Sequence, residues 1–153
     1  MVWKPHVTVA AIIEQNGRFL LVEEETEEGL QFNQPAGHLE ANEDLIAAIR
    51  REVAEETAWQ FEPEALVGIH LWRKNPDSPS FLRFCFTGHA HTHNPNQALD
   101  TGIIAAHWLS LAEITARQQL LRSPLVLISI QEYLQGQRHP LTLLQSFLDL
   151  THA

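Results

Sequence analysis

Three glutamates, Glu52, Glu55 and Glu56, lie close together in a segment whose composition favours a helix. At about 100° per residue, Glu55 and Glu56 fall about 60° and 40° to either side of Glu52, so the three side chains share one stripe of the predicted helix. Like charges at this spacing destabilise an isolated helix by about a few tenths of a kcal/mol per pair, and a bound divalent ion would reverse that effect. Carboxylate oxygens suit a hard cation, and Mg²⁺ is usually held by a few carboxylates, waters and substrate phosphates. The spacing therefore indicates metal-assisted phosphate chemistry.

The alternative interpretation is a solvated helix face, which is what most glutamate clusters on helices are. Two neighbouring features favour a site. Four apolar side chains within residues 45–53 form a stripe centred about 70–80° from Glu52, so the acids border the buried face of the predicted helix. The preceding segment, residues 34–38, predicts a Pro/Gly turn in which Gly37, lacking a Cβ, would let the backbone approach a ligand.

The spacing of these residues resembles the Nudix box, the signature of enzymes that hydrolyse nucleoside diphosphates linked to another group. Gly37 is followed after five residues by Glu43 and after seven more by the run 51–56, Arg-Glu-Val-Ala-Glu-Glu. The signature continues with any residue, a glycine and an aliphatic residue, whereas this chain has Ala58 and Trp59 in the last two places. Because that glycine normally ends the catalytic helix, Ala58 predicts either a backbone that avoids a positive φ or a modest strain there.

The resemblance implies a role for each residue of the signature. The implied metal ligands, for Mg²⁺ or for Mn²⁺ in its place, are the carbonyl of Gly37 and the side chains of Glu52, Glu55 and Glu56. Either Glu52 or Glu55 would also deprotonate or orient the attacking water. Arg51 joins these two as a catalytic candidate because the resemblance implies that it pairs with Glu43 to position the helix. Divalent ions at such a centre supply water activation and charge neutralisation for pyrophosphate hydrolysis.

Two features outside the signature are weaker candidates. Many relatives add an acidic residue from a later loop, and within residues 89–106 the sequence offers Asp100 alone as an additional metal ligand or base. A plain loop aspartate is the favoured interpretation. His89, His91 and His93 alternate, so their imidazoles could share one face of a strand. We favour a surface strand end, because nothing around them is arranged as a closed zinc site.

Substrate contacts are predicted from aromatic and basic residues on the strands after the helix. Trp72 and Phe81 could stack on a heterocyclic base, and Arg83 could meet phosphate. An aromatic side chain in a strand is more often part of the core, so core packing is the competing interpretation for Trp72 and Phe81.

Length and charge limit the remaining possibilities. The chain has 153 residues, and residues 1–153 are expected to form a single domain that is large enough to bury a hydrophobic core. The net charge of −9 argues against nucleic-acid or membrane-surface partners but not against a small phosphorylated substrate that arrives with metal ions. No apolar stretch approaches the roughly 20 residues of a membrane span, so we expect a cytoplasmic monomer or homodimer. Cys85, within an apolar run, is expected to be a buried small hydrophobe.

Strands alternate with two main helices in the predicted order of elements, which implies a sheet covered on both sides. The resemblance likewise implies an α/β fold, the Nudix α/β/α sandwich with a mixed β-sheet between helices. A turn at Asn16-Gly17 is the strongest hairpin signal, and the acidic run 23–29 is expected to be a solvated loop. The predicted strands are 6–13, 18–23, 66–72, 81–90 and 103–109. The predicted helices run from Asn42 or Glu43 to Ala58, from Ser110 to Ile114 and from Leu125 to Leu134, with a stop at Gly136.

Motifs beyond the signature resemble one subgroup of the family, the NudJ-type phosphatases. They are the QPAGHLE run at 34–40, the strand 81–84 and the tail 121–141. The subgroup resemblance implies stepwise release of phosphate from nucleoside tri- and diphosphates, with hydroxymethylpyrimidine diphosphate as a further substrate. Two alternatives stay open: a Nudix pyrophosphohydrolase that releases pyrophosphate or a mononucleotide from another nucleoside diphosphate derivative, and a non-catalytic ligand-binding module. The second would normally lose one or more of the metal-binding acids, and all three are present here.

Overall fold

The structure is a computed structural model that describes residues 1–149 of the chain. The strands in this range are β1 (His6–Ile12), β2 (Glu14–Gln15), β3 (Arg18–Thr26), β4 (Gly29–Asn33), β5 (Ala36–His38), β6 (Gln60–Trp72), β7 (Phe81–His91) and β8 (Ile103–Ser110). They form two four-stranded sheets. The first has the order β5-β1-β7-β6, and the second contains β2, β3 and β4 with β8 paired to β3.

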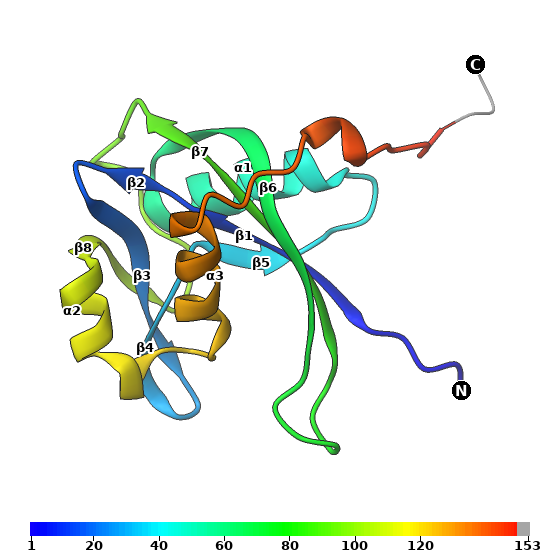
Figure 1. Ribbon diagram of the computed structural model, residues 1–153, viewed down its shortest axis with the longest axis horizontal. Helices are drawn as coiled ribbons and strands as arrows, with labels where there is room; N and C mark the ends of the chain where they lie inside the picture. The colour runs from blue at the N-terminus through cyan, green and yellow to red at the C-terminus, as the bar shows by residue number, and fades with distance from the viewer. Residues whose placement is uncertain (150–153) are drawn as a thin grey trace.

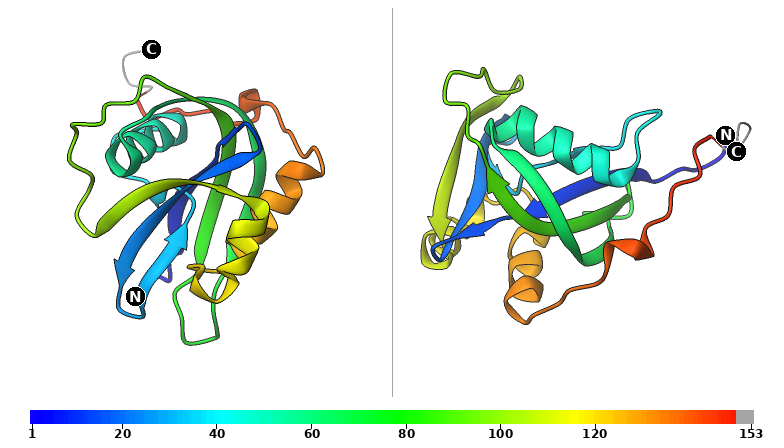
Figure 2. Two further views of the ribbon diagram at one scale, coloured as in Figure 1. Left: turned by 90° about the vertical axis from the view of Figure 1, so that its left-hand side faces the viewer. Right: turned by 90° about the horizontal axis from the view of Figure 1, so that it is seen from above.

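Two helices cover opposite faces of the first sheet. They are α1 (Leu45–Thr57) and α3 (Leu125–Leu134), and the right-hand view of Figure 2 shows the sheet between them (Figure 1, Figure 2). The short α2 (Leu111–Ala116) follows β8 on the second sheet. Since β1 runs parallel to β7 and antiparallel to β5, the first sheet is mixed. The predicted α/β/α sandwich with a mixed sheet is confirmed, but the strands divide into two sheets instead of one.

The first sheet sends alternate side chains into two hydrophobic clusters. On β7, Phe86 packs in the cluster of Ile49 and Val53 from α1, whereas Cys85 packs with Val126 from α3. This alternation is what a strand covered on both faces requires. Cys85 is fully buried, as predicted, and burial raises the pKa of its thiol.

The predicted hairpin at Asn16-Gly17 is confirmed, although it joins different strands from those expected. Both residues have positive φ, as a tight two-residue turn requires, and the turn pairs β2 with the start of β3. The strand that was predicted from residue 6, β1, pairs instead with β5 and β7 in the other sheet.

The prediction of a loop over residues 23–29 is wrong. β3 continues to Thr26 and pairs with β4 and β8, so a ladder on both sides extends the strand. Cationic or hydrogen-bonding partners also reduce the repulsion between its acids. The Oε1 atom of Glu24 accepts from Arg122 at 2.7 Å, and that of Glu23 lies 3.0 Å from Nε2 of His107.

The prediction of a turn over residues 34–38 is also wrong, because Ala36–His38 form the edge strand β5. Gly37 stands opposite Val9 of β1, so the segment is held by a strand distant in sequence. The helix that follows begins at Leu45, later than predicted. Its N-cap is Asp44, whose side chain accepts from the backbone N–H of Ala47 at 2.7 Å.

The other predicted strands and helices are present, with one strand starting earlier than expected, whereas β4 was not predicted. β6 begins at Gln60 instead of residue 66, and Pro63 is accommodated at a register shift in this strand, where a missing N–H is tolerated. α2 has the expected Ser110 cap, and Gly136 after α3 has a positive φ of 86°. In the described part of the chain, two 3₁₀ turns complete the helices, Gln118–Leu120 and Leu141–Leu143. None of the helices within residues 1–149 is long and apolar enough to cross a membrane.

Candidate active site

β5 and α1 bring the glycine and the first glutamate of the signature into direct contact. A Cβ placed on Gly37 would lie 2.1 Å from the carboxylate carbon of Glu52, far inside van der Waals contact. The Glu52 side chain is only 10% exposed, so it has little room to retreat. Glycine at this position is therefore a packing requirement of the buried carboxylate. That Gly37 lets the backbone approach a ligand stays a prediction.

Glu56 lies beneath the same strand and is as buried as Glu52, each residue being 7% exposed. Its Oε1 atom accepts a hydrogen bond from the backbone N–H of Ala36 at 2.9 Å. Burial raises the pKa of the Glu56 carboxyl to about 8, the Ala36 hydrogen bond opposes the rise, and the charges of Glu52, Glu24 and Asp100 add to it. A cation placed here would relieve both the desolvation and the repulsion.

Arg51 connects the two ends of the signature. Its Nε and Nη2 atoms donate to the two carboxylate oxygens of Glu43 at 3.0 and 2.7 Å, and Nη2 also donates to the His38 carbonyl at 3.0 Å. This paired hydrogen bond lowers the pKa of Glu43 and raises that of Arg51. The Arg51–Glu43 pair that the resemblance implied is thus present, and Arg51 fixes α1 against the end of β5.

The remaining nitrogen of Arg51, Nη1, lies between Glu52 and Glu55. Nη1 donates to Glu52 at 2.8 Å and to Glu55 at 3.3 Å. Burial raises the pKa of Glu52, and the hydrogen bond from Arg51 counteracts the rise. Glu55 is the most accessible of the three carboxylates, with 45% of its side chain exposed.

A loop after β7 holds the C-terminal end of α1 and brings Asp100 to the site. The backbone N–H of Asp100 donates to the Glu55 carbonyl at 2.9 Å, and the side chain of Gln97 donates to the Ala54 carbonyl at 2.7 Å. The Asp100 bond satisfies a carbonyl that the helix end leaves free, and the Gln97 bond is a second one to the Ala54 carbonyl, which also accepts from the N–H of Ala58. The charge of Asp100 contributes to the raised pKa values of Glu52 and Glu56, so this loop residue acts on the acidic cluster.

Ala58 ends α1 in the left-handed conformation, with a φ of 62°. The second of the two expectations for this position is therefore correct: the backbone keeps the conformation of the missing glycine and bears the strain. Its carbonyl accepts from the N–H of Asn94 at 2.9 Å, so the same loop stabilises the strained exit.

The donor atoms fit a hard divalent ion. Glu52, Glu55 and Glu56 provide carboxylate oxygens near the backbone of Gly37, and the raised pKa of Glu56 reflects a buried acid that is short of positive charge. Within residues 1–149, no three His, Cys, Asp or Glu side chains already converge on one point. Hydrogen bonds to Arg51 and to the Ala36 N–H hold these carboxylates, and Mg²⁺ would compete with those bonds.

Glu24 of β3 is a residue that the sequence did not reveal. It is half-buried, pairs with Arg122, and its charge contributes to the raised pKa of Glu56. It was missed because residues 23–29 were predicted to be a solvated loop, where a carboxylate is not expected to face a site. The one available signal was that the apolar run of β3 continues directly into the acids.

The predicted substrate residues separate into two groups. Trp72 and Phe81 lie side by side on adjacent strands with ring centroids 6.2 Å apart, and Phe81 also stacks on His6 at 5.3 Å. These rings are partly exposed. Arg83, in contrast, is 7% exposed in the layer between the sheet and α3. The structure therefore leaves the aromatic pair accessible and places Arg83 inside the protein.

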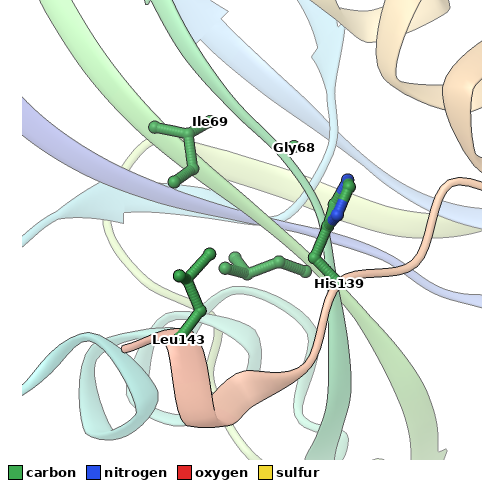
Figure 3. Close-up of a pocket in the computed structure, with 5 residues that line it drawn as sticks. Gly68, Ile69, His139 and Leu143 are labelled. Carbon is green, nitrogen blue, oxygen red and sulfur yellow. The ribbon is translucent and has the colours of Figure 1, made fainter. Parts of the chain in front are cut away.

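A separate pocket of about 230 Å³ lies between β6 and the segment after α3 (Figure 3). It is lined by Leu66, Gly68, Ile69, His139 and Leu143. None of these residues is a carboxylate or belongs to the predicted site. The acidic cluster beside β5, and not this apolar pocket, has the groups that phosphate chemistry needs.

Comparisons with known proteins agree with this geometry. The family model of the NUDIX domain matches residues 4–126. The chain is 43% identical over 145 residues to the phosphatase NudJ of Escherichia coli K12, covering 95% of this chain and 94% of that protein. Among solved structures, a NUDIX hydrolase from Nitrosomonas europaea has 48% identity and a TM-score of 0.91, covering 94% of this chain and 98% of the other.

A more distant neighbour shares the fold alone. The NUDIX domain of NrtR from Shewanella oneidensis, solved in complex with ADP ribose, is 17% identical with a TM-score of 0.72, covering 88% of this chain and 90% of that one. The family assignment rests on the closer matches and on the spacing of the signature residues described above. This chain belongs to the Nudix hydrolase family and is an enzyme that acts on acid anhydrides in phosphorus-containing compounds.

Proposed function

We propose that this enzyme is an Mg²⁺-dependent phosphatase that removes phosphate groups from nucleoside tri- and diphosphates, with hydroxymethylpyrimidine diphosphate as a further substrate. The observation that carries the proposal is the buried Glu56 carboxylate, whose pKa is raised to about 8 beside Glu52. Such a cluster is stabilised by a hard cation and by the phosphate groups that share it. The E. coli relative that covers nearly the whole chain is named a phosphatase, which supports release of phosphate.

The residues of the cluster would divide the work. Glu52, Glu55, Glu56 and the Gly37 carbonyl would hold the metal, with Mn²⁺ able to replace Mg²⁺. The bound metal would neutralise phosphate charge and lower the pKa of water. Glu52 or Glu55 would take the proton of the attacking water, and both carboxylates accept from Nη1 of Arg51, which would hold them in place.

Arg51 has a positioning role in this proposal. Three of its hydrogen bonds go to Glu43 and to the His38 carbonyl, so its guanidinium fixes the helix against β5. Asp100 is proposed as an additional acid at the same centre, because its backbone is bonded to the Glu55 carbonyl and its charge acts on Glu56. Trp72 and Phe81 remain candidates for stacking on the base of a nucleotide.

A substrate panel with product analysis tests the proposal. The purified enzyme is incubated with Mg²⁺ and each nucleoside tri- and diphosphate, hydroxymethylpyrimidine diphosphate and ADP ribose, and orthophosphate and pyrophosphate are measured separately. We expect orthophosphate from the first three classes, and no turnover when EDTA replaces Mg²⁺.

Other products would point to the alternatives. Pyrophosphate or a mononucleotide as the first product would replace the proposal by a pyrophosphohydrolase. Binding of these ligands without turnover would indicate a ligand-binding module. The variant that tests the site is Glu56→Gln. It preserves the size of the side chain and its ability to accept from the Ala36 N–H while removing the charge. Undiminished turnover in this variant would contradict the assignment of the site.

A further inference from the structure

The last residues of β7 carry two imidazoles on the surface, outside the acidic cluster. His89 and His91 are both exposed, and their ring centroids lie 5.7 Å apart. Residues two apart on a strand point to the same face, so the rings are neighbours because of the strand itself and not because of a loop. Ala90 between them is buried, which fixes the orientation of this part of the strand.

Each of these imidazoles uses its Nδ1 atom for a hydrogen bond to oxygen. Nδ1 of His89 lies 2.9 Å from Oε1 of Glu64, and Nδ1 of His91 lies 2.9 Å from Oγ1 of Thr92. A carboxylate can only accept, so the proton of neutral His89 is on Nδ1 and the lone pair is on Nε2. Within residues 1–149, neither Nε2 atom has a protein partner. Both residues are exposed.

We propose that His89 and His91 form an open site for a borderline transition-metal ion such as Ni²⁺, Cu²⁺ or Zn²⁺, bound through the two Nε2 atoms and completed by water. Imidazole is a preferred ligand of these ions, whereas Mg²⁺ prefers oxygen, so the site would differ in chemistry from the acidic cluster. The Glu64 partner of His89 supports the assignment, because histidines that bind a metal usually donate their other ring N–H to an oxygen.

The surroundings favour a cation but do not close the site. Glu64 accepts from His89, and Glu62 stands opposite His89 on β6, where it pairs with Arg50. His93 does not join the pair, because its ring stacks on Trp59 with centroids 4.7 Å apart. Within residues 1–149, no three His, Cys, Asp or Glu side chains converge on one point. Two imidazoles on one strand are enough for the open metal site proposed here, in which water completes the coordination.

Calorimetric titration of the untagged enzyme with NiCl₂ tests the proposal. Excess Mg²⁺ is present throughout to occupy the acidic cluster. We expect one equivalent of Ni²⁺ to bind, and His89→Gln or His91→Gln to weaken binding by more than about tenfold, since loss of an outer-shell partner alone has an effect of that order. Glu64→Gln should weaken binding by about tenfold for that reason. With Cu²⁺, electron paramagnetic resonance should show nitrogen coupling from two imidazoles.

His93→Gln is the matched control, because it removes a neighbouring histidine that the site does not use. It should change Ni²⁺ affinity by less than about twofold, within the usual context dependence of surface substitutions. The four substituted residues, His89, His91, Glu64 and His93, are all exposed. The melting temperature of each variant should therefore stay close to that of the parent, which would report intact folding. Unchanged Ni²⁺ binding in the double variant His89→Gln/His91→Gln, or equal loss in His93→Gln, would overturn the proposal.

Discussion

Two buried polar clusters lie on opposite faces of the same sheet and differ in how their charges are satisfied. On the α1 face, the acids Glu52 and Glu56 are desolvated beside β5, and burial raises the pKa of both. On the α3 face, the guanidinium of Arg83 donates to Gln34 at 2.9 Å, to Ser129 at 2.7 Å and to His70 at 3.3 Å. The first cluster has more carboxylates than cationic groups. In the second, the buried cation is surrounded by hydrogen-bond acceptors.

The difference distinguishes a reactive site from a structural one. Arg51 contacts Glu52 and Glu55, whereas Glu56 accepts from the neutral N–H of Ala36 and has no cationic partner among residues 1–149, so an added cation would stabilise its charge. In the α3 cluster the cation itself is buried and already has three acceptors. Hydrogen bonding alone does not separate the clusters, since within residues 1–149 no buried side-chain nitrogen or oxygen lacks a partner in either. The two clusters meet at residues 34–36, where the side chain of Gln34 binds Arg83 and the N–H of Ala36 binds Glu56.

Glu56→Gln should separate activity from stability most strongly. We expect turnover to fall by more than ~100-fold, because loss of an outer-shell partner of a metal site already lowers activity by one to two orders of magnitude. Without metal, the melting temperature should be maintained or raised, since the substitution removes a buried acid and keeps an acceptor for Ala36 N–H. Steady-state assays with Mg²⁺ and thermal melts in EDTA measure the two effects. A loss of activity matched by an equal loss of stability would remove the distinction between the clusters.

Arg83→Met should give the opposite result. Removal of the guanidinium leaves the Gln34 carbonyl oxygen and its neighbours without a donor, so the free energy of unfolding should fall by about 2 kcal/mol. Turnover of the folded enzyme should be reduced far less than in Glu56→Gln. Urea unfolding and kinetics at low temperature provide the measurements, with Arg18→Met as the control for loss of an exposed ion pair, worth less than about 1 kcal/mol. If KM rises strongly while stability is unchanged, Arg83 contacts the substrate phosphate as the sequence suggested.

Gly37→Ala should disturb the acidic cluster through packing. A Cβ 2.1 Å from the Glu52 carboxylate forces a rearrangement, and overpacking of this kind destabilises by about 1–2 kcal/mol. In the double variant Gly37→Ala/Glu52→Ala the clash is absent, so the two substitutions should couple favourably in a double-mutant cycle of unfolding free energies. Strict additivity would show that Gly37 and Glu52 are not in the close contact described above.

The fold could be predicted where a pattern within one segment determines the structure. The Asn16-Gly17 turn and the 3.6-residue period of α1 are such patterns, and both were confirmed. β5 was missed because a three-residue edge strand has no measurable period and exists only by pairing with β1. The end of β3 was missed because its acids are stabilised by Arg122 and His107, which are distant in sequence.

The candidate site shows the same division. Gly37, Glu52 and Glu56 belong to one spaced signature, so their proximity followed from the sequence, and the contacts with Arg51 agree with it. Glu24 and Asp100 come from β3 and from a distant loop, and their effect on Glu56 depends on tertiary packing that no local spacing encodes. Sequence therefore identifies the centre of the site, and the fold determines which outer acids act on it.

The pH dependence of stability tests the Glu56 carboxyl by titration. The pKa of Glu56 is about 8 in the folded protein, above its ordinary value of 4.5, so the metal-free protein is stabilised by this group below pH 4.5 and loses that contribution as the pH rises towards 8. Mg²⁺ binds the ionised form, so the increase in melting temperature on adding Mg²⁺ should grow between pH 6 and about 8. Thermal melts with and without Mg²⁺ across this range measure it. Glu56→Gln should show much less pH dependence of the increase, and an equally steep rise in that variant would assign the titration to another group.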